Sequence, residues 1–189
     1  MSARALLPLL LAGSLLPACA QGEYQIGDVG PGGGVVYYMA DEPFPCGPAL
    51  TAECTHLEAA PESGEVRRVW SVAPDPEVAT VGADRSGIGA GAANTSEAVL
   101  HSGVAAVESA AAYADTYVHN GYSDWYLPSK EELFELYEYM VQTGVATRGT
   151  YWSSTDYAFI TAWCLDFSQG PLRRQLQDDE LLVWPVRAF

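Results

Sequence analysis

The chain has 189 residues, of which 49% are hydrophobic and 11% aromatic, a composition typical of a folded protein with room for one domain. It carries 24 acidic and 9 basic residues, which gives a formal net charge of −15 at pH 7. Such a charge excludes nucleic-acid binding through a general positive surface, and it opposes binding to anionic lipid or sulfated glycans at low salt.

Residues 1–18 have the layout of an export signal. Arg4 supplies a positive charge, and the apolar stretch after it is shorter than a membrane-spanning helix. The stretch ends in Leu-Pro-Ala-Cys19, which resembles the lipobox of bacterial lipoproteins and implies lipidation of Cys19. Ordinary signal-peptidase cleavage near Ala18 or Ala20 is the alternative.

The segments after the signal predict a tether and one domain. Residues 19–23 form the lipidated N-terminus with a short tether, and residues 24–189 form a single domain. In lipoproteins a residue other than Asp after the lipidated Cys favours outer-membrane sorting, and here that residue is Ala20. We therefore expect an exported protein, anchored by lipid at the outer membrane or cell surface.

The remaining cysteines agree with an oxidising compartment. Cys46 and Cys54 bracket a short loop that contains Gly-Pro, and this spacing predicts a local disulfide. Cys164 lies in an apolar run and is predicted to be a buried free thiol. Because no Cys-x-x-Cys pair occurs, neither a metal site nor a cofactor is predicted.

The first half of the domain reads as strands and long loops. A glycine-rich turn over residues 27–34 leads into a strand over residues 35–39. Residues 41–93 are rich in proline and glycine, with short strands expected at 57–60 and 69–72.

Two helices follow. Asn94 or Thr95 is expected to cap the first, whose apolar residues repeat at helical spacing as far as Ala114. The second begins with a capping box of Ser129 and Glu132, and Gly144 ends it.

The last third predicts strands, at residues 151–155, 160–167, 172–177 and 181–188. Strands at both ends with helices between them define an α+β domain. Core packing is expected for all five tryptophans: Trp70, Trp125, Trp152, Trp163 and Trp184.

Six ordered motifs resemble one family. They are Tyr24-x-Ile-Gly-Asp-x-Gly-Pro-Gly-Gly-Gly-Val-Val-Tyr-Tyr, Leu57-Glu-Ala-Ala-Pro, Gly89-x-Gly-x-x-Asn-Thr, Gly121-Tyr-x-Asp-Trp-Tyr-Leu-Pro-Ser-Lys-x-Glu-Leu, Tyr151-Trp-Ser-Ser and Val186-Arg-Ala-Phe. These motifs and their order resemble those of the family typified by the C-terminal domain of the Legionella collagen-like adhesin. The resemblance implies a C-type lectin-like fold with two helices, long loops and paired terminal strands, so that residues 35–39 lie beside residues 183–188. It also implies adhesion to sulfated polysaccharides, which the strong negative charge of this chain opposes.

The hypothesis that follows is a non-enzymatic envelope lipoprotein that binds a glycan or a protein near the cell surface. The expected contact surface is the late-strand face around five residues: Asp156, Tyr157, Arg173, Arg174 and Gln175. In lectin-like folds ligands commonly meet this half of the domain, and the two arginines suit an anionic group.

Two other functions remain open. Asp156 and Asp166 flank the tryptophan-bearing strands and could act as acid and base of an envelope enzyme that hydrolyses polysaccharide. The protein could also be a purely structural envelope component. The acidic triplet at residues 178–180 favours a solvated turn over a calcium site, because the usual calcium-binding lectin motifs do not occur.

Overall fold

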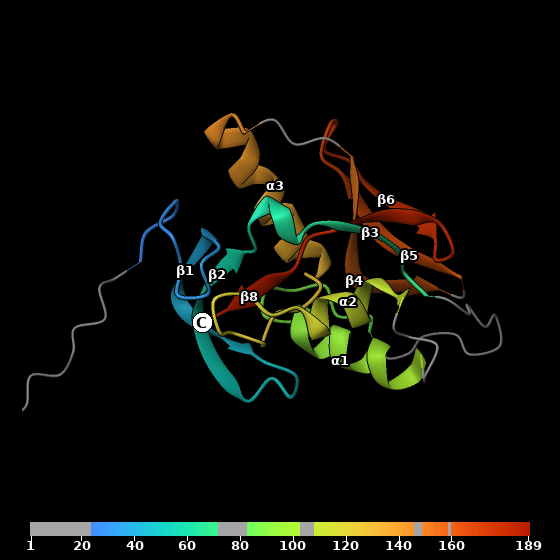
Figure 1. Ribbon diagram of the computed structural model, residues 1–189, viewed down its shortest axis with the longest axis horizontal. Helices are drawn as coiled ribbons and strands as arrows, with labels where there is room; N and C mark the ends of the chain where they lie inside the picture. The colour runs from blue at the N-terminus through green and yellow to red at the C-terminus, as the bar shows by residue number, and fades with distance from the viewer. Residues whose placement is uncertain (1–23, 72–82, 103–107, 146–148, 159) are drawn as a thin grey trace, which may run out of the picture.

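The computed structural model describes residues 24–71, 83–102, 108–145, 149–158 and 160–189. The expected signal, Cys19 and the tether lie outside these ranges. The described chain is α+β, as predicted, with a three-stranded sheet and a five-stranded sheet beside three α-helices (Figure 1). No helix among the described residues is long and apolar enough to cross a bilayer.

The three-stranded sheet brings the two ends of the domain together. It contains β1 (Val35–Cys46), β2 (Ala52–Ala59) and β8 (Val186–Ala188), in the order β1-β2-β8. Both pairings are antiparallel. The expected direct pairing of the terminal strands is wrong, because β2 lies between them and uses both of its edges.

The five-stranded sheet has the order β3-β7-β4-β5-β6. Its strands are β3 (Val66–Val69), β4 (Thr150–Ala158), β5 (Thr161–Asp166), β6 (Leu172–Leu176) and β7 (Glu180–Val183). The strand predicted over residues 181–188 is therefore two strands in different sheets. Pro185 lies between them, where its missing N–H cannot continue a ladder.

The helical region also differs from the prediction. The single helix expected from Asn94 to Ala114 is two helices, α1 (Gly91–Ser102) and α2 (Ala110–Thr116), and a 3₁₀ turn occupies Glu62–Gly64. Asn94 does not cap α1 but lies inside it, and its amide donates to the carbonyl of Arg85.

The third helix follows the prediction. The helix α3 (Lys130–Thr143) begins at a complete capping box of Ser129 and Glu132. Gly144 ends it in the left-handed conformation, at φ 71°. Both signals are local in the chain, which is why the sequence alone predicts them.

Two apolar clusters hold the sheets and helices together. One joins the three-stranded sheet to α3 around Trp125 and Trp184, and the other joins the five-stranded sheet to α1 and α2 around Trp70 and Trp152. Core packing is thus confirmed for these four tryptophans, each at most 4% exposed. Trp163 is the exception, since it is only partly buried.

Candidate binding face

A row of aromatic rings and cationic groups crosses β4, β5 and β6. The rings of Tyr157 and Trp163 meet edge to face, with centroids 5.4 Å apart. The guanidinium of Arg174 lies 4.5 Å from the centroid of Tyr157, and the ammonium of Lys130 lies 5.0 Å from that of Trp163. Edge-to-face ring contacts and cations placed over a ring face are both electrostatically favourable, because the face of an aromatic ring is negative and its edge is positive. We call these four residues the aromatic–cation face.

Strand pairing explains why these residues meet. Trp163 on β5 is directly opposite Arg174 on β6 in the antiparallel register, so their side chains stand on the same side of the sheet. The pairing of β4 with β5 is irregular on both sides of Asp156. Tyr157 follows this irregularity and is 45% exposed. The ring of Tyr157 on β4 therefore lies in one row with Trp163 on β5 and Arg174 on β6.

An open pocket lies on this part of the surface. It has a volume of about 610 Å³, and five residues line it: Tyr157, Trp163, Leu172, Arg173 and Arg174. Three of the nine basic residues of the chain, Lys130, Arg173 and Arg174, lie here. Within the described part of the chain, neither Lys130 nor Arg174 forms an ion pair with a carboxylate. The face therefore offers positive charge next to exposed ring surface.

Only some of the five predicted contact residues lie at this pocket. Tyr157 and Arg174 meet as described, and Arg173 reaches the same pocket while pairing with Asp166 at 3.3 Å. Gln175 is half-buried and donates to Asp179.

Asp156 is wrongly placed in the predicted surface, since it is only 3% exposed. Its carboxylate accepts hydrogen bonds from the side chain of Gln177 and from the N–H of Tyr157. Burial raises the pKa of Asp156, although these hydrogen bonds oppose the shift. Asp156 thus lies at the irregularity of β4, directly before the exposed Tyr157.

The two carboxylates considered for hydrolysis do not converge. Asp156 is opposite Ala162 and Asp166 is opposite Thr150, so they stand near opposite ends of the β4–β5 pair. Four residues along β5 separate these positions, which is about 13 Å. Glycosidase carboxylates are separated by about 5 to 10 Å. Asp166 is also engaged by Arg173 and Ser168, and the hydrogen bonds from Ser168 lower its pKa.

Sequence reasoning missed Trp163 and Lys130 as surface residues. Trp163 stands in an apolar run, Ala162-Trp-Cys-Leu165, and was therefore expected in the core. Next to the turn that joins β5 to β6, Leu165 is opposite Leu172. In the same register, Trp163 is opposite Arg174. Register counted outward from that turn could have identified the pair. No local sequence pattern predicts that Lys130, at the start of α3, lies over the ring of Trp163.

A buried ionic network occupies the other end of the domain. The Glu58 carboxylate, wholly buried on β2, accepts hydrogen bonds from the N–H groups of Gly32 and Gly34. It also accepts from Nη1 of Arg187 at 2.8 Å, while Nε of Arg187 donates to Asp124 at 2.6 Å. Burial alone would lower the pKa of Arg187, but the two carboxylates outweigh it and raise that pKa. The glycine turn, β2, β8 and the loop before α3 are thus joined by one charge cluster.

These elements are the ones that carry the ordered sequence motifs. The family model of the Lcl C-terminal domain matches residues 57–187, which is more than half of the chain. The chain belongs to this family. A search of curated proteins finds no match. Glu58, Asp124 and Arg187 all lie inside the matched range, whereas the glycine turn that binds Glu58 precedes it.

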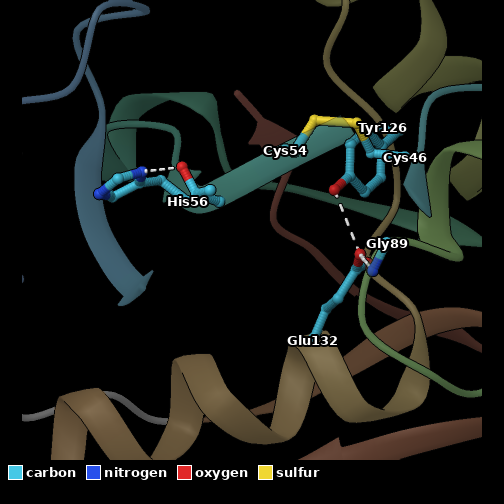
Figure 2. Close-up of a disulfide and its surroundings, with 7 residues drawn as sticks. Cys46, Cys54, His56, Gly89, Tyr126 and Glu132 are labelled. Carbon is cyan, nitrogen blue, oxygen red and sulfur yellow. Dashed lines mark hydrogen bonds between the residues drawn. A yellow bond between two sulfur atoms is a disulfide. The ribbon is translucent and has the colours of Figure 1, made fainter. Parts of the chain in front are cut away.

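A second buried carboxylate fixes the loops of this Lcl C-terminal domain. Glu132 accepts hydrogen bonds from the N–H group of Gly89 and from the hydroxyl of Tyr126 (Figure 2). It also accepts one from the N–H group of Ser129. Burial raises its pKa to about 7, even though the backbone hydrogen bonds act in the opposite direction. The Gly89 motif and the Glu132 motif, more than forty residues apart, are thereby joined.

The disulfide and the free thiol are as the sequence predicts. Cys46 and Cys54 are bonded and close the β1–β2 hairpin (Figure 2). Cys164 is a buried free thiol whose pKa burial raises to about 11. Among the described residues of this Lcl C-terminal domain, no group of three or more His, Cys, Asp or Glu side chains could hold a metal ion.

Proposed function

We propose that this protein is a non-catalytic envelope lipoprotein whose Lcl C-terminal domain binds a glycan through the aromatic–cation face. The observation that carries the proposal is the stack of Lys130, Trp163, Tyr157 and Arg174 beside an open pocket. Aromatic rings present flat apolar surfaces that suit the C–H face of a sugar ring. The neighbouring guanidinium donates hydrogen bonds in a planar fork that suits carboxylate and other anionic groups.

Charge favours a glycan that carries acidic groups. The whole chain has a formal charge of −15, so diffuse attraction of an anion is not expected. Locally, however, Arg174 and Lys130 have no carboxylate partner in the described part of the chain. Binding of an acidic sugar there would place its charge against these two cations at short range, where screening by salt is weaker.

The arrangement of the domain supports recognition away from the membrane. Tyr24, the first described residue, packs against Phe189 at the end of the molecule that holds the three-stranded sheet, and β5 and β6 lie at the opposite end (Figure 1). A lipid on Cys19 would be five residues from Tyr24, at most about 17 Å of chain. The aromatic–cation face would then point outward. We include the C-type lectin-like fold in the proposal, on the basis of a sheet that joins both ends of the domain.

Hydrolysis of polysaccharide is the rival function. Asp156 on β4 and Asp166 on β5 are offset by about 13 Å along the strand direction, which favours binding without cleavage. Release of reducing ends from envelope polysaccharide by the purified protein would support the rival function.

The proposal is tested on a glycan array with the mature protein and its Arg174→Ala variant. The array contains neutral, uronic-acid and sulfated glycans. We expect binding to acidic glycans and a loss of about tenfold or more in the variant, since a hydrogen bond to a charged group contributes about 1.5 to 3 kcal/mol. Arg67→Ala is the matched control, because Arg67 is an exposed arginine on β3, outside the aromatic–cation face.

Other outcomes are equally informative. Capture of an envelope protein that depends on Arg174, with no glycan binding, would assign a protein ligand instead. Absence of any binding on the array and in pull-downs from envelope extracts would contradict the proposal.

The lipid anchor is tested separately. The mature protein should partition into detergent and have a mass that includes acyl chains on Cys19, and Cys19→Ala should abolish both properties. A water-soluble product cleaved near Ala18 or Ala20 would remove the anchor and leave the binding proposal in place.

A further inference from the structure

A second pocket lies between the closed end of the β1–β2 hairpin and the loop before α3. It has a volume of about 410 Å³, which is in the range of small-molecule sites. The disulfide of Cys46 and Cys54 and the rings of Trp125 and Tyr126 contribute to its walls. Asp115 and Asp124 are the acidic residues that line it. None of these residues belongs to the aromatic–cation face.

Apart from these acidic residues and Ser123, the lining of the pocket is mostly apolar. The two cysteines are bonded to each other and buried, and Trp125 and Tyr126 are 2% and 4% exposed. Figure 2 shows the ring of Tyr126 beside the disulfide, with its hydroxyl directed away from the sulfur atoms toward Glu132. The hydroxyl of Tyr126 is thus engaged elsewhere. The ring and the sulfur atoms provide a surface that favours the hydrocarbon part of a ligand.

The charge at the pocket is negative. Asp115 is exposed, and no hydrogen bond or ion pair engages its carboxylate in the described part of the chain. Asp124 pairs with Arg187, but the same guanidinium also neutralises the buried Glu58. One positive charge therefore serves two carboxylates, and Asp115 adds a further negative charge. No Lys or Arg is among the described residues that line the pocket.

We propose that this pocket binds an organic cation with an apolar body, either a free alkylammonium or the lysine side chain of a peptide. The hydrocarbon part lies against Trp125, Tyr126 and the disulfide, and the ammonium lies against Asp115 and Asp124. The proposal is independent of glycan binding, because it uses other residues in another part of the molecule.

The test is ligand-observed saturation-transfer NMR with the mature protein and four probes. Butylammonium represents the free amine, and the blocked tripeptide acetyl-Gly-Lys-Gly-amide represents the peptide side chain. Butanol and the norleucine analogue of the tripeptide are their neutral counterparts. We expect at least one cation to bind more tightly than its neutral counterpart, and which cation binds distinguishes the two sources. Added salt should weaken that binding.

Three variants locate the site. Asp115→Asn should weaken cation binding about two- to fivefold, the range for a partly exposed ion pair. Ala52→Phe should abolish it by filling the mouth of the pocket, which Ala52 lines. Asp178→Asn removes the same charge from the exposed turn before β7 and should change nothing. Circular dichroism checks that each variant is folded. Equal binding of cations and neutral probes, no binding at millimolar concentration, or no effect of Asp115→Asn and Ala52→Phe would overturn the proposal.

Discussion

The guanidinium of Arg187 on β8 lies 2.8 Å from the carboxylate of Glu58 on β2, and both groups are buried. The two residues are directly paired across the antiparallel ladder, so the sheet itself sets this contact. Arg187 also covers the ring of Tyr122 at 4.1 Å. The residue therefore connects the last strand, the second strand and the loop before α3. Such a buried pair is costly to break because one uncompensated charge would stay inside the protein.

Removal of this guanidinium should strongly destabilise the domain. In Arg187→Met the Glu58 carboxylate keeps its backbone donors but loses its counter-charge. We expect the free energy of unfolding to fall by about 3 to 5 kcal/mol, measured by urea denaturation. The matched control is Arg67→Met, an exposed arginine that donates to a backbone carbonyl and should cost less than about 1 kcal/mol. Equal effects of the two substitutions would contradict a special role for the Glu58 pair.

Local signals explain what the sequence predicts well. The capping box at Ser129 and Glu132 and the closure at Gly144 depend on residues within one or two turns. The disulfide of Cys46 and Cys54 depends on a separation of eight residues. These features could be read without knowledge of the rest of the fold.

Non-local competition explains the errors. Whether β8 pairs with β1 or with β2 depends on which of these strands has an unpaired edge in the folded sheet. The residues of β8 alone do not determine this. Asn94 is a residue type that is common at helix N-caps, but α1 begins before it, at Gly91, and the Asn94 amide donates to the carbonyl of Arg85. Pro185 is a local signal for a break, and the prediction of one strand over residues 181–188 does not take it into account.

The candidate site was predictable only in part. Tyr157 and Arg174 lie together on late strands of one sheet, and ligand contact through them stays a prediction. The burial of Asp156 was not, since it follows from an irregular β4–β5 register. Trp163 was assigned to the core because exposed and buried tryptophans look the same in an apolar run.

Protonation of Glu132 should stabilise the domain. Its pKa is about 7 in the folded protein and 4.5 in the reference state, so the folded state binds more protons between these values. The contribution of Glu132 to stability therefore declines as pH rises from about 4.5 to 7, by about 3 kcal/mol. Glu132→Gln removes this titration. The difference in unfolding free energy between variant and wild type should change over that pH window.

Two results would contradict this prediction. One is a pair of stability profiles that stay parallel from pH 4 to pH 8. The other, which does not depend on how well the variant folds, is a carbon-13 NMR titration of wild-type Glu132 with a midpoint at its ordinary value. Asp156 also has a raised pKa, but its titration is common to both proteins.

The thiol of Cys164 should be unreactive in the folded protein. It is fully buried, and burial raises its pKa to about 11, so at neutral pH the nucleophilic thiolate is scarce. We expect iodoacetamide to modify Cys164 in urea but not under native conditions, as read by peptide mass spectrometry. The Cys46–Cys54 pair should stay unmodified in both conditions without a reductant. Rapid native alkylation of Cys164 would contradict the buried position on β5.

Gly89 and Gly47 provide a matched test of the contact between the Gly89 loop and the end of β1. Both have left-handed backbone angles, with φ of 84° and 81°, so alanine carries a similar conformational cost at either position. A Cβ at Gly89 would lie only 2.0 Å from the carbonyl oxygen of Pro45, whereas one at Gly47 meets nothing within 4 Å. Gly47→Ala should therefore lower stability by about 1 kcal/mol, and Gly89→Ala by several kcal/mol. Urea unfolding of both variants checks this. Similar losses at the two positions would mean that the Gly89 loop does not rest on the β1–β2 hairpin.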